Sequence, residues 1–554
     1  MGSYQSTITT TVLPGTNDNP VKIIRTDLTD PFTLRGFERD QVYNGLDVCV
    51  THEILPRMLA QLDPLTSRTY QFERDLQGPV LEMRLRGCLV DQSRRAEVID
   101  QFWETLDQLE ADLNRIVLDG VGMTEFNWRS PAHLRKLFYS ELGLPTVRRG
   151  GKVTIDDDAR EGLATYPIAT QIVAYINAMT DLGKKISVLR TEIDPDGRIR
   201  TSYGIAGTST GRFSSSISEF GTGGNLQNIE ESLRSILVAD PGYKFVKLDG
   251  KSCQSRVVGA IEWNLFGDGR YLDVCESGDP HTTVAKLVWT GLGWTGDHYL
   301  DRGIAERAFY RHYTHRFMCK KIGHGSNFGG QPPAIAFETK LPVGIIAEFQ
   351  PKYFAAFPAH RQRLAWTAEE LRTKGYLTSL TGRRRYFFGR RSDRKVVNEA
   401  AAYDPQDTEA YVVNSAMLNI WRKNLAIVMF QDHDALTFMY PEADEDRIVP
   451  ILQREILVPI PLANGRELII PYDCEVGWNK GHYDEQTNPD GLREYTGHDP
   501  RSRRPKVDFL DRIVRRGNRR PSRARDLAPV DSDINDSSDA VAEGMVTDEL
   551  EAVS

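Results

Sequence analysis

The stretch YKFVKLDGKSCQSR, residues Tyr243–Arg256, contains the first candidate site residue, a carboxylate at the end of a predicted strand. Phe245 to Asp249 has the pattern of a short, mostly apolar strand that ends in a carboxylate, and the spacing after Arg256 becomes helical. Gly250 lets another group approach the backbone closely. A carboxylate at the end of a buried strand is costly unless a cation neutralises it. A metal ion is one candidate for that cation, and a helix-capping aspartate is the simpler alternative.

Composition and length limit the class of protein. The chain has 554 residues, which is room for several domains, and its 40% apolar and 26% charged content is ordinary for a globular protein. No apolar run approaches the roughly 20 residues that span a bilayer. The six cysteines form no close pairs, which excludes a zinc ribbon and favours a reducing compartment. We therefore expect a cytoplasmic protein (in the host cell if it is viral) with no membrane partner.

The net charge of −8 hides a very uneven layout. Residues 501–525 carry eleven Arg or Lys against two Asp, and residues 526–554 carry nine acidic residues and no basic ones. Residues 485–554 as a whole have the Pro-, Gly-, Arg- and Asp-rich composition of a disordered tail. Any binding to a polyanion must therefore depend on local basic grooves and not on the overall charge.

A cationic and aromatic stripe lies just past the middle of the chain. Its members are spaced by four residues and would share one face of a helix: Arg316, Lys320, His324 and Phe328. Such a stripe would hold phosphates at its cationic end and stack a flat ring at the other. A solvated basic face that ends at the Gly329–Gly330 pair is the alternative.

A second strand-end carboxylate lies far along the chain. Between residues 427 and 439, apolar residues flank Asp432-His433-Asp434, a pattern that predicts a tight β-hairpin with its acids at the turn. Two-metal phosphoryl transfer needs carboxylates that bridge two ions about 3.5–4 Å apart, with Lys or Arg on the departing phosphates. Asp249, Asp434 and the cationic stripe would supply this set.

These motifs, taken together, resemble family A DNA polymerases, the bacterial DNA polymerase I class, and most of all its bacteriophage members. The resemblance runs from about residue 43 to residue 483. In chain order its motifs are Thr210-Gly-Arg212 with Asn225-Leu-Gln-Asn228, then Asp249 to Arg256, then Arg316, Lys320 and Phe328-Gly329, then Gly382-Arg-Arg-Arg-Tyr386, and finally His433-Asp434.

The resemblance implies an α+β multidomain fold, the polymerase right hand, with an antiparallel palm sheet and helical fingers and thumb. The implied segments are an exonuclease remnant (1–65), the thumb (66–193), the palm (194–262 and 366–484), the fingers (263–365) and the tail (485–554). The implied activity is template-directed DNA synthesis, in which dNTPs are added to a primer 3′-OH and pyrophosphate is released. Its partners would be primer-template DNA and dNTPs.

The resemblance also implies residue roles. Asp249 and Asp434 would be catalytic and, with the Gly250 carbonyl, would bind two Mg²⁺ ions that Mn²⁺ could replace. Lys320 would be the third catalytic residue, giving pyrophosphate a proton. The residues implied in dNTP binding are Arg316, Lys320, His324, Phe328, Gln254 and His281. Those implied in DNA binding are Arg212, Asn228, Arg256, Arg383, Arg384, Gln406 and His433.

Three positions depart from the family pattern. Gln254 stands where a glutamate usually forms the steric gate against ribose, so the bulk is kept and the charge is lost. His324 replaces an aromatic ring beside the sugar. Ala435 follows Asp434 where a glutamate is common, so a third palm carboxylate is missing. We expect turnover nonetheless, because both main metal ligands are present.

Tyr43 and Asp47 match the last motif of a proofreading 3′–5′ exonuclease and would face the same way on a helix. No Asp-x-Glu element precedes them in this chain. A complete proofreading site is therefore not expected here. Either a separate exonuclease polypeptide docks on this region, or the region is a degenerate stub that supports the thumb.

Two other functions remain open from the sequence. One is a single-subunit RNA polymerase-like enzyme of the same fold, because Gln254 and His324 alter the surroundings of the sugar. The other is a non-catalytic subunit that binds primer-template DNA. The presence of Asp249, Asp434, Arg316 and Lys320 together argues against the second.

Overall fold

The computed structural model of the protein describes residues 8–13, 21–26 and 37–497. The chain divides into two compact units, Met1–Gln71 and Phe72–Ser554. In the first unit, β1 (Ile8–Leu13) and β2 (Val21–Thr26) form an antiparallel hairpin, and α1 (Phe37–Leu59) follows. Tyr43 and Asp47 both lie on α1, as the helical spacing predicted. Helix α2 (Pro64–Arg86) begins in the first unit and continues into the second.

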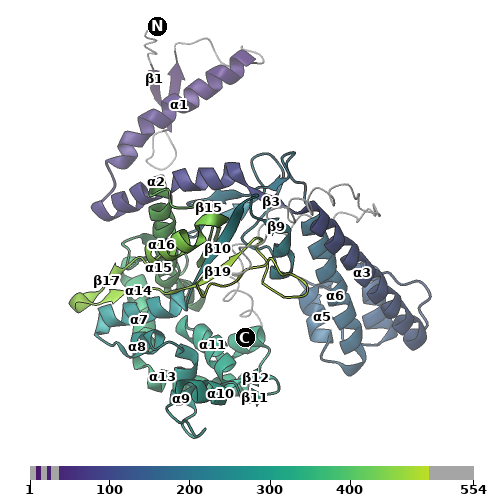
Figure 1. The fold of residues 1–554 in the computed structure, drawn as a ribbon. Helices are drawn as coiled ribbons and strands as arrows, with labels where there is room; N and C mark the ends of the chain where they lie inside the picture. Colours follow the sequence, from purple (N-terminus) through teal and green to yellow (C-terminus); the bar gives the residue numbers. More distant parts are fainter. Residues whose placement is uncertain (1–7, 14–20, 27–36, 498–554) are drawn as a thin grey trace. The chain divides into compact units, whose positions relative to one another are not determined.

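The second unit is built on an antiparallel five-stranded sheet with the order β15-β16-β10-β19-β20 (Figure 1). The strands are β10 (Tyr243–Gly250), β15 (Ile427–Asp432), β16 (Ala435–Pro441), β19 (Tyr472–Gly477) and β20 (Arg493–Glu494). Both the strand that ends at Asp249 and the hairpin around His433 are therefore confirmed. Val246 and Leu248 of β10 are fully buried, and alternate positions along the strand belong to different core clusters.

Strand β20 corrects the predicted start of the disordered tail. It lies inside residues 485–554 and pairs with β19 through Glu475↔Glu494 and Val476↔Arg493. A two-residue edge strand between turns carries no periodic signal, so composition alone could not distinguish it from a tail. The neighbouring Leu492 is 2% exposed, which shows that the segment joins the core. Residues 498–554, with the predicted basic and acidic blocks, lie outside the described residues.

Long helices cover one face of the sheet. Helix α15 (Arg394–Arg422) and helix α16 (Glu445–Glu455) pack there with the second half of α2. Helix α15 is 29 residues long and carries Gln406. Its buried positions include Val413, Met417 and Ile420, which meet Leu436 and Phe438 of β16.

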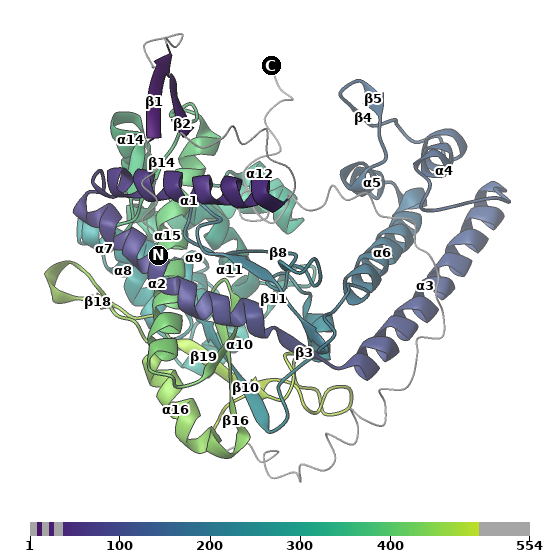
Figure 2. The same cartoon turned by 90° about the horizontal axis from the view of Figure 1, so that it is seen from above.

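Residues 72–193 are largely helical, which agrees with the helical segment that the resemblance implied for residues 66–193. Helix α3 (Gln92–Val121) packs along α6 (Pro167–Leu189), and the two lie side by side in both views (Figures 1 and 2). Ser130 caps α4 (Pro131–Arg135), which continues as a π-helical turn over Lys136–Glu141. Helix α5 (Asp157–Leu163) and a small hairpin of β4 (Arg148–Arg149) and β5 (Lys152–Val153) complete this segment.

A cluster of helices follows β10. Its members are α7 (Cys253–Phe266), α8 (Arg270–Glu276), α9 (Pro280–Val288), α10 (His298–Ala305), α11 (His315–Asn327), α12 (Pro332–Thr339), α13 (Val343–Ala356) and α14 (Pro358–Lys374). Helices α7 and α14 are joined by a buried charge network, in which Glu262 Oε1 lies 2.6 Å from His360 Nδ1 and 3.4 Å from Arg363 Nε. This network joins two helices of the cluster, and one of them, α7, begins three residues after the end of β10.

Short strands complete the second unit. They are β3 (Cys88–Val90), β6 (Arg198–Ile199) and β9 (Leu237–Val238) in one sheet, and the pairs β7 (Ser202–Gly204) with β8 (Ser214–Ser216), β11 (Ala308–Tyr310) with β12 (Tyr313–Thr314), β13 (Tyr376–Thr378) with β14 (Arg384–Tyr386) and β17 (Ile460–Pro461) with β18 (Glu467–Leu468). Among the described helices, none is long and apolar enough to cross a membrane.

Candidate active site

Sheet register brings the two predicted acids together. Asp249 at the end of β10 pairs with Ala435 at the start of β16, and the Gly250 N–H donates to the Asp434 carbonyl at 3.0 Å. A Cβ on Gly250 would lie closer than 3.0 Å to Cys253 Sγ, so this approach requires glycine. His433 has a φ of 60°, the left-handed conformation that two-residue hairpin turns require. The turn therefore holds Asp434 beside the end of β10.

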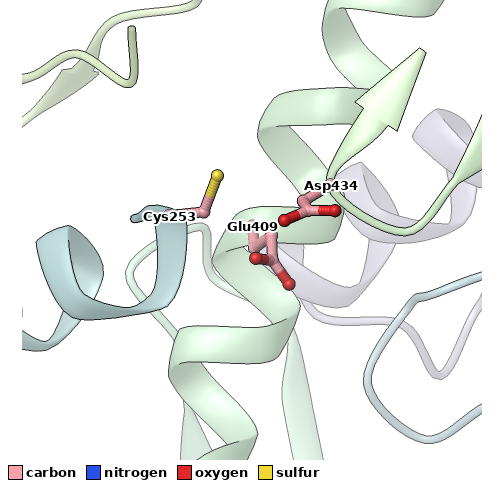
Figure 3. Close-up of side chains that lie close together, drawn as sticks. All are labelled: Cys253, Glu409 and Asp434. Carbon is pink, nitrogen blue, oxygen red and sulfur yellow. The ribbon is translucent and has the colours of Figure 1, made fainter. Parts of the chain in front are cut away.

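A third carboxylate, Glu409, lies at the same place and was not predicted. One ligand atom each from Cys253, Glu409 and Asp434 lies within 4.8 Å of the others (Figure 3). The three side chains come from α7, α15 and the β15–β16 turn. In sequence, Glu409 is one of several acids on a long helix and looks like part of a solvated face. Only the packed fold shows that it is 2% exposed.

The electrostatics of this group favour a bound cation. Burial, followed by the charges of Glu409 and Asp249, raises the pKa of Asp434 to about 7. Burial also raises the pKa of the Cys253 thiol well above its usual value, so this group stays protonated and is a poor ligand for a hard ion. Asp249 and Asp434 offer the oxygen ligands that Mg²⁺ prefers, and a divalent ion there would relieve their repulsion. The residues present therefore fit a metal centre.

Asp249 opens onto a cavity of about 730 Å³, which we call the β10–α11 cavity. Five of the predicted site residues line it: Asp249, Arg256, His281, Arg316 and Lys320. The cavity walls also carry Lys247, Lys251, Asp473, Glu475 and Glu494. Lys247 Nζ lies 2.6 Å from Asp249 Oδ2, so a lysine neutralises that carboxylate in this structure. The cavity thus joins one predicted metal ligand to the cationic end of the predicted stripe.

Arg316, Lys320 and His324 share one face of α11, as the spacing predicted, but the two ends of the stripe differ. Lys320 is exposed, whereas Arg316 Nε donates to Asp279 at 3.1 Å. His281 lies beside them, and burial, then Arg316 and Lys320, lowers the pKa of its ring to about 4. His281 is therefore neutral at pH 7, and a neutral imidazole can donate one hydrogen bond and accept another.

Helix α11 ends at Asn327, and Phe328 follows as its capping residue. The Phe328 ring is 9% exposed and packs in the core of the helix cluster, 5.0 Å from the His324 ring in an edge-on arrangement. Burial lowers the pKa of His324. Neither residue lines the β10–α11 cavity, so the aromatic end of the stripe is packed in the core while its cationic end is open.

The predicted DNA-binding residues are mostly engaged within the protein. Arg212 pairs with Glu409, and Arg383 pairs with Glu73 and Asp407 at 2.7 Å each. Buried Arg256 donates from Nε to the Lys251 carbonyl at 3.1 Å.

The other predicted DNA-binding positions lie on separate segments of the second unit. Arg384 lies on β14 with its guanidinium 4.9 Å from the Tyr376 ring, Gln406 is half-buried on α15, and Asn228 is exposed. His433 Nδ1 is buried and has no hydrogen-bond partner among the described residues. Buried polar atoms without partners are uncommon and are expected where a ligand completes the site.

The family model for DNA polymerase family A matches residues 93–291 and 302–484. A thermostable DNA polymerase I of Thermus aquaticus is 27% identical over 427 residues, which is 74% of this chain and 47% of that protein. DNA polymerase I of Chloroflexus aurantiacus is 27% identical over 473 residues, which is 80% of this chain and 46% of that protein. The chain thus spans about half the length of the curated relatives it matches.

A solved structure shares the fold. The POL domain of Pol1 from M. smegmatis, in complex with DNA primer-template and dNTP, superposes with a TM-score of 0.59 at 21% identity, covering 77% of this chain and 72% of that one. This likeness confirms the predicted α+β right-hand polymerase fold. The motifs that line the β10–α11 cavity and the hairpin of Asp434 fall within the two segments that the family model matches. The chain therefore belongs to DNA polymerase family A.

Proposed function

We propose that this chain is a DNA-directed DNA polymerase that adds dNTPs to a primer 3′-OH and releases pyrophosphate. The observation that carries the proposal is the convergence at one sheet edge: Asp249 and Asp434 are adjacent, and Asp249 shares a cavity with Arg316 and Lys320. Carboxylates beside a cationic pocket match the needs of phosphoryl transfer. Family membership supports the same reaction.

Each residue would have a distinct task. DNA polymerases of this family use divalent metal ions, and Mg²⁺, or Mn²⁺ in its place, held by Asp249, Asp434 and the Gly250 carbonyl would make the primer hydroxyl a better nucleophile. Arg316 and Lys320 would bind the triphosphate, because both line the cavity. The exposed Lys320 ammonium would also give the departing pyrophosphate a proton. Neutral His281 would donate a hydrogen bond without adding charge.

The remaining assignments extend the proposal along the chain. We assign the thumb to residues 66–193, the fingers to 263–365 and the palm to 194–262 and 366–497, with β20 included. Primer-template DNA would then contact the palm through Arg212, Asn228, Arg383, Arg384, Gln406 and His433. The internal ion pairs of Arg212 and Arg383 would be exchanged for phosphates or base edges on binding.

The decisive experiment is primer extension with an Asp249→Ala variant. We expect extension to be abolished while primer-template affinity stays within about twofold, because Asp249 would hold the ion and not the DNA. Extension at the wild-type rate would reject the site assignment. Primer-template binding by the wild-type chain without any extension would instead favour a non-catalytic subunit. Comparing rNTPs with dNTPs on the same template tests the RNA polymerase alternative.

Two finer parts of the proposal concern the N-terminal unit and the source. We propose that residues 1–65 are an exonuclease remnant on which a separate 3′–5′ exonuclease polypeptide docks, with Tyr43 and Asp47 on α1. A pull-down from the source extract tests whether an exonuclease binds this chain. Extension from a 3′-mismatched primer, by the chain alone and by the chain with its pulled-down partners, tests for proofreading. The phage assignment stays a prediction, because the relatives reported above are bacterial. The cytoplasmic location likewise stays a prediction.

A further inference from the structure

Glu409 holds two of the predicted site residues at once. Its carboxylate Oε2 accepts a hydrogen bond from Gln254 Nε2 at 3.2 Å and another from Arg212. The glutamate is 2% exposed and lies beside Asp434 (Figure 3). It therefore joins three elements, namely the loop of Arg212, the first turn of α7 and helix α15. No motif of the family resemblance gave this residue a role.

The bond from Gln254 fixes the orientation of an otherwise ambiguous group. A side-chain amide has a donating and an accepting end of nearly the same shape, whereas an ionised carboxylate only accepts. Glu409 therefore requires the NH₂ of Gln254 to face it, and the amide carbonyl must point away from it. The Arg212 guanidinium donates to the same oxygen and holds the carboxylate in place. These two bonds favour a positioning role for Glu409 over a role as a third metal ligand.

We propose that Glu409 is a positioning residue that locks Gln254 as the wall against a 2′-hydroxyl, and so helps this enzyme select deoxyribonucleoside over ribonucleoside triphosphates. The proposal rests on the proposed polymerase function and on Gln254 occupying the sugar gate. A glutamine held at its amide cannot rotate away from an extra oxygen, whereas a free one can change rotamer at a small cost. The usual gate glutamate is thus replaced in this chain by two residues: Gln254 supplies the bulk, and the buried carboxylate of Glu409 holds it in place.

A double-mutant cycle on the sugar preference tests this role. The ratio of kcat/KM for dNTP to kcat/KM for the matching rNTP is measured for the wild type, Glu409→Ala, Gln254→Ala and the double variant. We expect Glu409→Ala to lower the ratio by roughly tenfold, the size of one hydrogen bond to a charged group. In the Gln254→Ala background, the same change should alter the ratio by less than about twofold.

Two further variants keep the test decisive. Glu409→Gln keeps the volume and can still accept one bond, but it also donates, so the amide of Gln254 loses its unique orientation. Glu409→Gln should lower the ratio of kcat/KM for dNTP to kcat/KM for rNTP by roughly threefold. If Glu409→Ala fails to fold, Glu409→Gln takes its place in the double-mutant cycle. Glu399→Ala is the matched control, a glutamate on the same helix paired with Arg385, and it should leave the ratio unchanged.

The possible outcomes separate the two hypotheses. A wild-type chain without any DNA synthesis would overturn the proposed function, and this inference with it. A wild-type chain that synthesises DNA, with equal effects of the Glu409 changes in both Gln254 backgrounds, would overturn the positioning role alone. An unchanged sugar ratio in Glu409→Gln and Glu409→Ala would do the same. A drop in both kcat/KM values without a change in their ratio would show a general structural role for Glu409 instead.

Discussion

Replacing Gly250 by alanine tests the geometry that places Asp434 beside Asp249. The added methyl would lie closer than 3.0 Å to Cys253 Sγ and 3.2 Å from the Asp434 carbonyl oxygen. Neither atom is the end of a long flexible side chain, because one is on the first turn of α7 and the other is backbone. The strand end must therefore shift, and overpacking of this kind costs about 1–3 kcal/mol.

That strain falls directly on the site, because the Gly250 N–H also donates to the Asp434 carbonyl. If about 1.4–2.8 kcal/mol of this strain raises the activation barrier, kcat/KM for primer extension should fall roughly 10–100-fold. We expect primer-template affinity to change little. Steady-state extension assays and a filter-binding or anisotropy titration measure the two quantities.

Cys253→Ala provides the rescue, because it removes the sulfur that the new methyl would meet. The double variant Gly250→Ala/Cys253→Ala should recover most of the lost activity, whereas independent effects would add. Gly183→Ala is the control for a glycine substitution, since a Cβ built there on α6 meets nothing within 4 Å beyond the neighbouring backbone of its own helix. A fully active Gly250→Ala enzyme, or a double variant no better than Gly250→Ala, would refute the packing argument.

Three other changes give sharp expectations. Burial raises the pKa of Asp404 to about 7, so the folded state holds a proton more tightly than the unfolded state, and stability is lost as pH rises from about 4 to 7. Asp404→Asn should therefore raise Tm by roughly 2–4 °C at pH 8 and leave it unchanged at pH 4, as calorimetry can check. Lys247→Met should tighten Mn²⁺ binding about tenfold in a calorimetric titration, because Lys247 now neutralises Asp249; unchanged affinity would reject this. Arg316→Ala should raise KM for dNTP at least tenfold with unchanged primer-template affinity, and an unchanged KM would remove Arg316 from the nucleotide site.

The sequence could predict the parts of the site that depend only on residues close together in the chain. The strand that ends at Asp249, the hairpin around His433 and the face of α11 each depend on neighbours within a few residues. Local periodicity and turn chemistry are strong signals at that range. The pairing of the two strand ends required the family resemblance, because a single sequence does not show which strands are adjacent.

The sequence could not show which side chains contact one another in the folded chain. In the sequence Glu409 is only one acid on a long helix, whereas in the structure Arg212 and Gln254 both donate to it. Phe328 looks like an exposed stacking ring, yet it packs in the core of the helix cluster. Strand β20 has too few residues to leave a pattern. In each case the deciding contact comes from a segment far away in the chain.

These acquired partners also change how substrate binding must be understood. Several charged groups proposed to bind metal, nucleotide or DNA already have partners in the protein. The pairs are Asp249 with Lys247, Arg316 with Asp279, Arg212 with Glu409, and Arg383 with Glu73 and Asp407. Binding then exchanges one partner for another, and its gain is the difference between two ion pairs. Partly exposed pairs contribute only about 0–1 kcal/mol each, so the exchange is cheap where water reaches them.

Lys320 stands apart from this pattern. It is exposed at the β10–α11 cavity, and no ion pair joins it to another described residue. An incoming triphosphate would therefore meet an uncompensated positive charge at Lys320 first, and only then draw Arg316 away from Asp279. Because opposite charges attract at longer range than hydrogen bonds form, this order follows from the charges alone. The ion pair of Arg316 would thus discriminate against anions too weak to displace Asp279, while Lys320 supplies the initial capture.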